Sequence, residues 1–338
     1  PKSSAMYDEL GVLYNMSVFN ILEPKVSKVV EGLEGKIILV YAGNSRGKTL
    51  QGTRMKKPLV LPFEHGINAI SGVPYFPVNS WSDFKKINMS LIKPATLDRV
   101  KDMYQTIIFD EVQASANYCQ EYICAKHDAE SIKTGNGGFG LWKEYETEFW
   151  REINRLTKAG FTIYFIAHEE RDKDTGQIRS KGDKRALAPI MDLADITIYL
   201  QSNGVDEDGR VIKSTGYLAE TPEFFARSRF EHIDTVIPEY TAENLEDVLI
   251  RAIQEQAKQD GTELVSFEEH QETNNTELDY DELMGKIKEQ YMRLSEEDKL
   301  EEYQAVVDEF LGQDAIVSEA TQKQVQILDL ILHSLIEK

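Results

Sequence analysis

The chain has 338 residues, of which 41% are hydrophobic and 28% are charged, and its formal net charge is −20. A chain of this length and hydrophobicity can bury a full core and leave residues for a second, smaller module. It contains no run of about 18 apolar residues and no basic-then-apolar N-terminal segment, so we expect an intracellular protein without a membrane partner. With only two cysteines, Cys119 and Cys124, a disulfide framework is excluded.

The negative charge is concentrated in the last part of the chain. Residues 243–338 hold about 25 acidic and 8 basic side chains, roughly −17, which leaves about −3 for everything before them. We therefore expect three parts, an N-terminal segment over 1–33, a near-neutral core over 34–242 and a small acidic helical module over 243–338. Solvated helix faces are the ordinary explanation of such a charge excess, and a tail that contacts partners is the alternative.

Strand-like apolar runs alternate with helical or irregular segments through the core. These runs are KIILVYA (36–42), PLVLPF (58–63), QTIIFDE (105–111), FTIYFIA (161–167) and DITIYLQ (195–201). Such alternation predicts an α/β fold with a mainly parallel central sheet covered by helices. Asn79 or Ser80 is the expected N-cap of the helix that begins WSDFKKIN, and the amphipathic stretch 141–160 predicts a helix that ends at Gly160.

Turn residues over 202–211, between β-rich runs, predict a hairpin at the end of the sheet. After about residue 242 the pattern becomes helical, with a polar linker over 268–282. Amphipathic helices are expected over 281–294, 301–311 and 321–338. The last of these has an apolar stripe wide enough to dock on the core or to pair with another copy.

The two cysteines lie with His127 in the short stretch CQEYICAKH. A zinc site in this stretch would still need a fourth ligand. We interpret these residues as ordinary side chains on a helix rather than as a metal site.

A phosphate-loop pattern follows the first of the core strands. The common pattern is G-x-x-x-x-G-K-[ST], and residues 42–49 match it except that Ala42 stands in the first place. Alanine fits there if its φ is negative, and the neighbouring Gly43 could adopt a positive φ. Gly47 lets the backbone approach the phosphates, Lys48 brings a cation to the β- and γ-phosphates, and Thr49 offers a hydroxyl to Mg²⁺. The predicted residues for binding ATP with Mg²⁺ are Gly43, Asn44, Ser45, Arg46, Gly47, Lys48, Thr49 and Leu50.

Acidic residues lie at the ends of two other predicted strands. Asp110 ends the strand over 105–111, where it can join Thr49 in holding Mg²⁺, and Glu111 follows it. An acid that caps the next helix is the alternative interpretation. Glu64 follows the strand over 58–63, so Glu64 and Glu111 compete for the role of polarising the attacking water.

Six segments, in this order and spacing, carry a family resemblance. They are VYAGNSRGKT, PLVLPFEHG, SWSDFKKI, QTIIFDEV, FTIYFIAHEERDKDTG and FFARSRF. Together they resemble the phage-encoded AAA-like P-loop ATPases with a RecA-type core, which occur among phage replication and recombination genes. The resemblance covers about residues 34–232 and does not extend to the acidic module. It implies a RecA-like P-loop NTPase fold and a protein of the bacterial host cytoplasm.

The resemblance also implies roles for single residues. In RecA-type cores the water-activating glutamate lies at the end of the strand after the phosphate-loop helix, and this favours Glu64. In AAA-type ATPases the glutamate directly follows the aspartate of the second nucleotide-binding motif, as Glu111 follows Asp110. His168, at a strand tip, matches the polar position that senses the γ-phosphate, although a hydrogen-bonded strand-end histidine would look the same. Arg227 and Arg229 match a basic pair that reaches the nucleotide of a neighbouring subunit, with a solvated basic edge as the alternative. Hydrolysis is therefore expected to need a homo-oligomer, either a ring or a filament.

DNA contact is expected from two loops. The segment after His168 takes the place of a RecA-type DNA-binding loop, and such basic loops can follow a phosphate backbone without reading bases. Its basic residues are Arg179, Lys181, Lys184 and Arg185. The second loop, KTGNGGFGLWK, has Phe139 and Trp142 among glycines, as a stacking platform would, although glycine-rich connectors with a buried aromatic also occur without nucleic acid.

These features predict an oligomeric ATPase that acts on single-stranded DNA in phage replication or recombination. A ring-type motor, such as a helicase or a packaging ATPase, is the alternative within enzymes. A nucleotide-switched interaction protein without DNA-stimulated turnover is the alternative from another class. The acidic module is expected either to compete with DNA for the basic loops or to recruit a single-stranded-DNA-binding protein or another replication protein.

Overall fold

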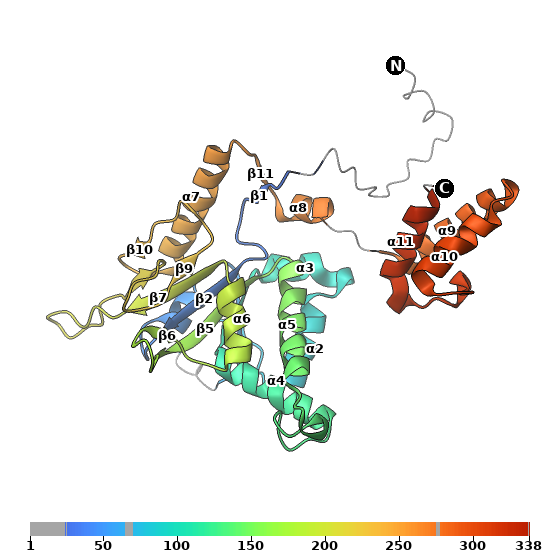
Figure 1. The fold of residues 1–338 in the computed structure, drawn as a ribbon. Helices are drawn as coiled ribbons and strands as arrows, with labels where there is room; N and C mark the ends of the chain where they lie inside the picture. Colours follow the sequence, from blue (N-terminus) through green and yellow to red (C-terminus); the bar gives the residue numbers. More distant parts are fainter. Residues whose placement is uncertain (1–23, 25, 65–69, 275–277, 337) are drawn as a thin grey trace. The chain divides into compact units, whose positions relative to one another are not determined.

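The computed structural model describes residues 24, 26–64, 70–274, 278–336 and 338 (Figure 1). Most of the expected N-terminal segment 1–33 therefore lies outside the described residues. The chain forms two compact units, one over Lys28–His270 and one that includes Gln271–Lys338. The first unit extends past the expected boundary at residue 242, because helix α7 (Ala242–Asp260) buries Leu245 and Leu249 in its core.

Five strands of the first unit run parallel to one another, in the order β7-β2-β5-β4-β3. Their bounds are β2 (Ile37–Ala42), β3 (Pro58–Pro62), β4 (Thr106–Asp110), β5 (Thr162–Arg171) and β7 (Ile196–Gln201). Each coincides with one of the apolar runs of the sequence. The predicted α/β fold with a mainly parallel sheet is confirmed.

Short strands extend the sheet with antiparallel pairs. Next to β7 lie β8 (Thr215–Tyr217), β9 (Arg227–Ser228) and, beyond β8, β10 (Val236–Ile237), while β6 (Ile178–Ser180) pairs with the end of β5. The β7–β8 pair, with the isolated bridge between Val205 and Val211 in its connection, is the hairpin expected at residues 202–211. A separate parallel pair joins β1 (Val29–Val30) to β11 (Leu264–Val265).

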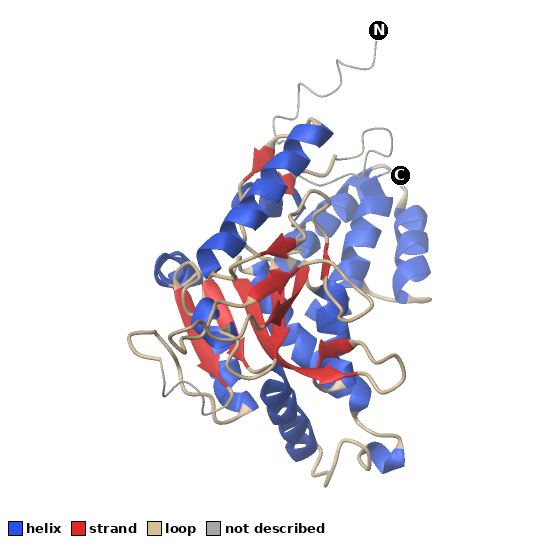
Figure 2. Ribbon diagram, turned by 90° about the vertical axis from the view of Figure 1, so that its left-hand side faces the viewer, coloured by secondary structure: helices blue, strands red, loops and turns tan. Residues whose placement is uncertain are grey.

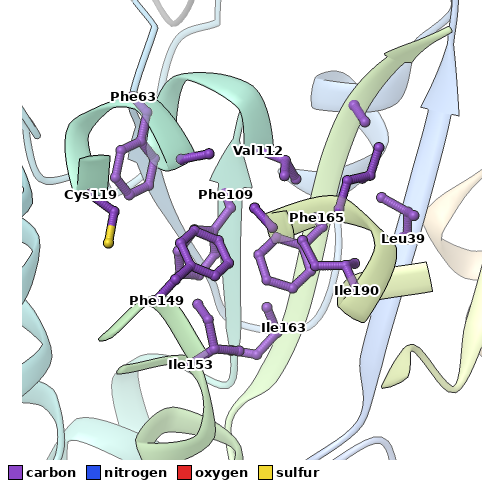
Figure 3. Packing of buried hydrophobic residues seen from close by; sticks show 14 of the residues in the cluster. Leu39, Phe63, Phe109, Val112, Cys119, Phe149, Ile153, Ile163, Phe165 and Ile190 are labelled. Carbon is purple, nitrogen blue, oxygen red and sulfur yellow. The ribbon is translucent and has the colours of Figure 1, made fainter. Parts of the chain in front are cut away.

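Helices cover both faces of the sheet (Figures 1 and 2). One face packs against α2 (Trp81–Leu91), α4 (Val112–Lys126), α5 (Trp142–Lys158) and α6 (Lys184–Leu193), and the other packs against α7. Strand alternation explains this division, because Leu39 and Tyr41 face the first group whereas Ile38 and Val40 face α7. Figure 3 shows the first core, where Phe109 and Phe165 of the sheet lie beside Phe149 of α5.

The remaining helices of this unit are short. They are α1 (Lys48–Gly52), α3 (Leu97–Met103) and the 3₁₀ turns η2 (Pro94–Thr96) and η3 (Asn136–Gly138). Helix α2 begins where expected, because the Ser80 side chain accepts a hydrogen bond of 3.1 Å from the Asp83 backbone N–H. Helix α5 ends before Gly160, as the sequence predicted.

The second unit is helical. Helices α9 (Tyr280–Glu296), α10 (Leu300–Leu311) and α11 (Val325–Ile336), with the turns η4 (Val317–Glu319) and η5 (Gln322–Gln324), share one apolar core. Leu328 and Leu332 of α11 are fully buried in it, so the apolar stripe of the last helix packs inside its own unit. The linker expected over 268–282 is partly helical, because α8 (Phe267–Asn274) occupies its first part.

None of the helices described is long and apolar enough to cross a lipid bilayer.

Candidate active site

Four strand ends bring the predicted site residues to one edge of the sheet. Parallel strands present their carboxyl ends at the same edge, and ligands of open α/β sheets bind there. Ala42 at the end of β2 pairs with His168 of β5, and Asp110 at the end of β4 pairs with Pro62 of β3. Glu64 follows β3, and its backbone N–H donates to the Asp110 carbonyl at 3.1 Å. The phosphate loop and these polar tips are therefore neighbours.

The phosphate loop adopts its bend at Ser45 and Gly47 rather than at its start. Gly47 is the N-cap of α1 with φ 87° and Ser45 has φ 60°, whereas neither Ala42 nor Gly43 has a positive φ. Alanine is thus tolerated in the first place of the pattern, and Gly43 does not use the positive φ that was open to it. Gly43 instead provides space, since a Cβ there would lie 3.3 Å from a carboxylate oxygen of Glu169.

Lys48 lies over this loop. Its Nζ donates to the carbonyls of Ala42 at 2.9 Å and Gly43 at 2.8 Å, and the side chain is buried. Burial lowers the pKa of Lys48, and the nearby Asp110 carboxylate opposes this shift. The loop residues Asn44, Ser45 and Leu50 are exposed, so the loop is open to solvent next to the Lys48 ammonium group.

Thr49 and Asp110 meet below the loop. The Thr49 hydroxyl donates to Asp110 Oδ2 at 3.0 Å, although the two residues lie on different elements. Burial raises the pKa of Asp110, and the hydrogen bond from Thr49 lowers it. A hydroxyl and a carboxylate oxygen are ligands that Mg²⁺ accepts, so this pair fits the ion expected with ATP.

Glu64, Glu111 and His168 converge beside that pair. One ligand atom of each lies within 4.8 Å of the others, and His168 Nε2 is 3.4 Å from Glu111 Oε2. Burial raises the pKa of Glu111 to about 7, and the adjacent Glu64 carboxylate adds to this shift. Burial also lowers the pKa of His168, with Lys48 contributing in the same direction. The imidazole is therefore biased toward its neutral form.

Three contacts around the loop involve residues that the sequence analysis missed. The Arg46 guanidinium donates to the Ser202 hydroxyl, and the Ser214 hydroxyl donates to the Arg46 carbonyl at 3.0 Å. Glu169 faces the loop at Gly43. The sequence could have indicated Ser202, because it is a small polar residue directly after the apolar run of β7. It could also have indicated Glu169, which follows His168 on β5 and therefore points to the other face of that strand.

Arg227 and Arg229 lie at the opposite edge of the sheet. Ser228 of β9 pairs with Ile196 at the start of β7, and Ile196 in turn pairs with Ile38 of β2. The phosphate loop begins four residues after Ile38, which is about 13 Å along β2 at about 3.3 Å per residue. The Arg229 guanidinium donates to the Asp192 carbonyl at 2.8 Å and lies 3.9 Å from an Asp195 carboxylate oxygen. Arg227 belongs to β9, and Arg229 follows that strand directly.

The basic segment after His168 adjoins the site. The Lys181 backbone N–H donates to the His168 carbonyl at 2.7 Å, and the Lys181 and Lys184 side chains are exposed. The other two cations cover aromatic rings, since the Arg179 guanidinium lies 5.9 Å from the Phe225 ring centroid and that of Arg185 lies 3.9 Å from the Trp142 centroid.

The glycine-rich loop separates its two aromatic residues. Phe139 is 90% exposed, whereas Trp142, at the start of α5, is half-buried beneath Arg185. The stacking platform expected from both residues is thus reduced to one exposed ring.

The cysteine stretch forms part of α4. Cys119 is buried, and His127 Nε2 lies 2.7 Å from a Glu144 carboxylate oxygen. Across the described ranges, the sole group of His, Cys, Asp and Glu side chains arranged to hold a metal is Glu64, Glu111 and His168, which includes none of these residues.

The sheet, the phosphate loop and the polar strand ends define a P-loop NTPase of the α/β class. The family model described as AAA domain matches residues 34–230, more than half of the chain, and the protein belongs to this AAA-domain family. The chain is 54% identical over 317 residues to the SPbeta prophage-derived uncharacterized protein YorG of Bacillus subtilis (strain 168), with 94% of this chain and 97% of that protein covered. A solved structure of a prototypical ATPase from the type III secretion system of pathogenic bacteria matches with 14% identity and a TM-score of 0.40, over 92% of this chain and 88% of that one.

Proposed function

We propose that this protein is a phage-type ATPase with a RecA-like core, which hydrolyses ATP as a homo-oligomer on single-stranded DNA during replication or recombination. One observation carries the ATPase part of the proposal. Lys48, the Thr49–Asp110 pair and a glutamate–histidine cluster meet at the carboxyl edge of one parallel sheet. Membership of the AAA-domain family supports it, and the prophage origin of the YorG relative supports the phage setting.

Each part of this edge has a chemical task in phosphoryl transfer to water. Lys48 would exchange its two loop carbonyls for phosphate oxygens and compensate their charge. Thr49 and Asp110 would hold Mg²⁺, which neutralises phosphate charge when bound. Glu64 would orient the attacking water and accept its proton, while His168, biased toward the neutral form, would donate a hydrogen bond to the γ-phosphate.

The position of the arginines supports a composite site between subunits. Arg227 and Arg229 lie at the edge opposite to the phosphate loop of their own chain, so they would reach a nucleotide only in a neighbouring copy. In the described part of the chain, the Arg227 guanidinium has neither a hydrogen bond nor an ion pair, which leaves it available for a partner. A positive charge supplied in this way is worth about 10³-fold or more in rate.

Single-stranded DNA is the proposed ligand of the exposed loops. A ring on which a base can stack contributes about 1–3 kcal/mol, and lysines nearby attract the phosphate backbone. Phe139 supplies such a ring, and Lys181 and Lys184 supply exposed cations. The hydrogen bond between the Lys181 backbone and His168 gives a short physical link from this segment to the nucleotide site.

ATP turnover with and without single-stranded DNA tests this function. We expect DNA to stimulate the wild-type rate, Phe139→Ala to lose the stimulation, and Phe139→Trp to keep it because the larger ring still stacks. ATP binding without turnover would favour the nucleotide-switched interaction protein. Turnover that depends on translocation along DNA, measured by displacement of a paired strand, would favour the ring-type motor.

A further inference from the structure

We propose that Glu64, Glu111 and His168 form a site for one divalent transition-metal ion, Mn²⁺ or Zn²⁺, distinct from the Mg²⁺ position at Thr49 and Asp110. The three ligands come from the ends of three neighbouring strands, β3, β4 and β5, so the sheet itself holds them together. One oxygen or nitrogen atom of each lies within 4.8 Å of the others.

The cluster brings two carboxylates, one of them buried, next to an imidazole. The Glu111 side chain is only 7% exposed, and a second carboxylate, Glu64, lies against it. No N–H group of the described residues donates a hydrogen bond to the Glu111 carboxylate, and the nearest approach is His168 Nε2 at 3.4 Å. Lys48 is bonded to two backbone carbonyls instead. A divalent cation placed between two adjoining carboxylates is attracted to both of them.

The ligand types select the class of ion. Two carboxylates and one imidazole balance a doubly charged ion, and the imidazole favours first-row transition metals over Mg²⁺ and Ca²⁺, which prefer oxygen ligands. Metal–ligand bonds are about 2.0–2.2 Å long, so ligands around one ion lie up to about 4 Å apart. The 3.4 Å between His168 and Glu111 fits this limit. Glu64 is exposed and can move inward by the remaining fraction of an ångström.

Such an ion would regulate the ATPase, in the event that the proposed function holds. It would occupy both carboxylates that can activate water and the histidine that faces the γ-phosphate. The free enzyme would then be held inactive until the ion left. The site itself, however, requires neither ATP nor DNA, so it can be tested apart from the proposed function.

Mn²⁺ binding to the full-length, nucleotide-free protein tests the site. Electron paramagnetic resonance measures free Mn²⁺ during a titration with excess Mg²⁺ present. We expect one Mn²⁺ per chain, with the affinity reduced about tenfold or more by Glu64→Gln and by His168→Gln. Glu64 is exposed, so its substitution leaves the core intact, and the melting temperature of both variants checks this. Thr49→Val, which removes the hydroxyl of the Mg²⁺ position, is the matched control and should bind Mn²⁺ like the wild type.

Three results would overturn the proposal. They are no stoichiometric Mn²⁺ in the wild type, wild-type affinity in both Glu64→Gln and His168→Gln, or loss of binding in Thr49→Val, which would place the ion at the phosphate loop. A protein that binds Mn²⁺ as expected but never turns over ATP would retain this site and refute the proposed function, so the two failures are distinguishable.

Discussion

Glu64 and Glu111 approach the same point from adjacent strands but differ in their surroundings. Glu111 is buried, and burial together with the adjacent Glu64 carboxylate raises its pKa to about 7. Glu64 is exposed and free to meet a water molecule. These differences favour Glu64 as the group that activates water.

We therefore expect Glu64→Gln to reduce ATP turnover by about 10²-fold or more while ATP binding is retained. Glu111→Gln should reduce turnover less. Steady-state turnover and binding of a fluorescent ATP analogue, measured on both variants, make the comparison. If Glu111→Gln is the more severe change, the water-activating role moves to Glu111, as in AAA-type ATPases.

At the scale of elements, helix α7 belongs to the folding unit of the ATPase core. Leu249 is fully buried against the sheet, whereas its neighbour Ile250 is 37% exposed. Leu249→Ala should lower the free energy of unfolding by about 2–5 kcal/mol, because it leaves a cavity in the core. Ile250→Ala is the control and should cost clearly less. Urea denaturation measures both values, and equal, small losses would mean that α7 is not part of the core.

Arg229, which directly follows β9, is proposed to act at the nucleotide of a neighbouring copy. Arg229→Ala and Lys48→Ala chains should each be inactive alone, yet an equal mixture should recover about a quarter of wild-type turnover. The estimate follows because one site in four combines an intact Lys48 with an intact Arg229 from its neighbour, when chains assemble at random. Turnover of mixtures with proven subunit exchange is the measurement. If such mixtures recover no turnover, Arg229 does not act at the nucleotide site of a neighbouring chain.

For the whole molecule, the acidic unit is the largest source of charge asymmetry. Residues 271–338 hold about 17 acidic and 6 basic side chains, roughly −11, and the structure sets the division from the core after His270. A tethered acidic segment can compete with DNA for basic loops, because tethering raises its effective concentration to about the millimolar range.

Truncation after His270 should therefore strengthen binding of single-stranded DNA and steepen its salt dependence. DNA titrations at several salt concentrations, with the assembly state measured in parallel, provide the test. Weaker or unchanged binding by a truncated protein that still assembles would instead favour recruitment of a partner protein by this unit.

Local sequence patterns predicted most of the fold, since each buried strand is a continuous apolar run and polar residues mark the strand ends. Contacts between distant residues could not be predicted in this way. The hydrogen bond from Arg46 to Ser202 joins the loop to the end of the neighbouring strand β7, which lies far away in the sequence, and no local pattern encodes it. Amphipathic helices likewise do not specify the surface on which they pack. For this reason the boundary at α7 and the packing of α11 inside its own unit emerged only from the structure.

The central claim is that the phosphate loop binds ATP for hydrolysis, and one comparison tests it most directly. ATP turnover is measured for the wild type, for Lys48→Ala and for Lys56→Ala, an equal change of charge at an exposed lysine nearby. The account predicts that Lys48→Ala abolishes turnover, because phosphate charge is left uncompensated, while Lys56→Ala retains the wild-type rate. Wild-type turnover in Lys48→Ala, or no turnover in any of the three proteins, would contradict it.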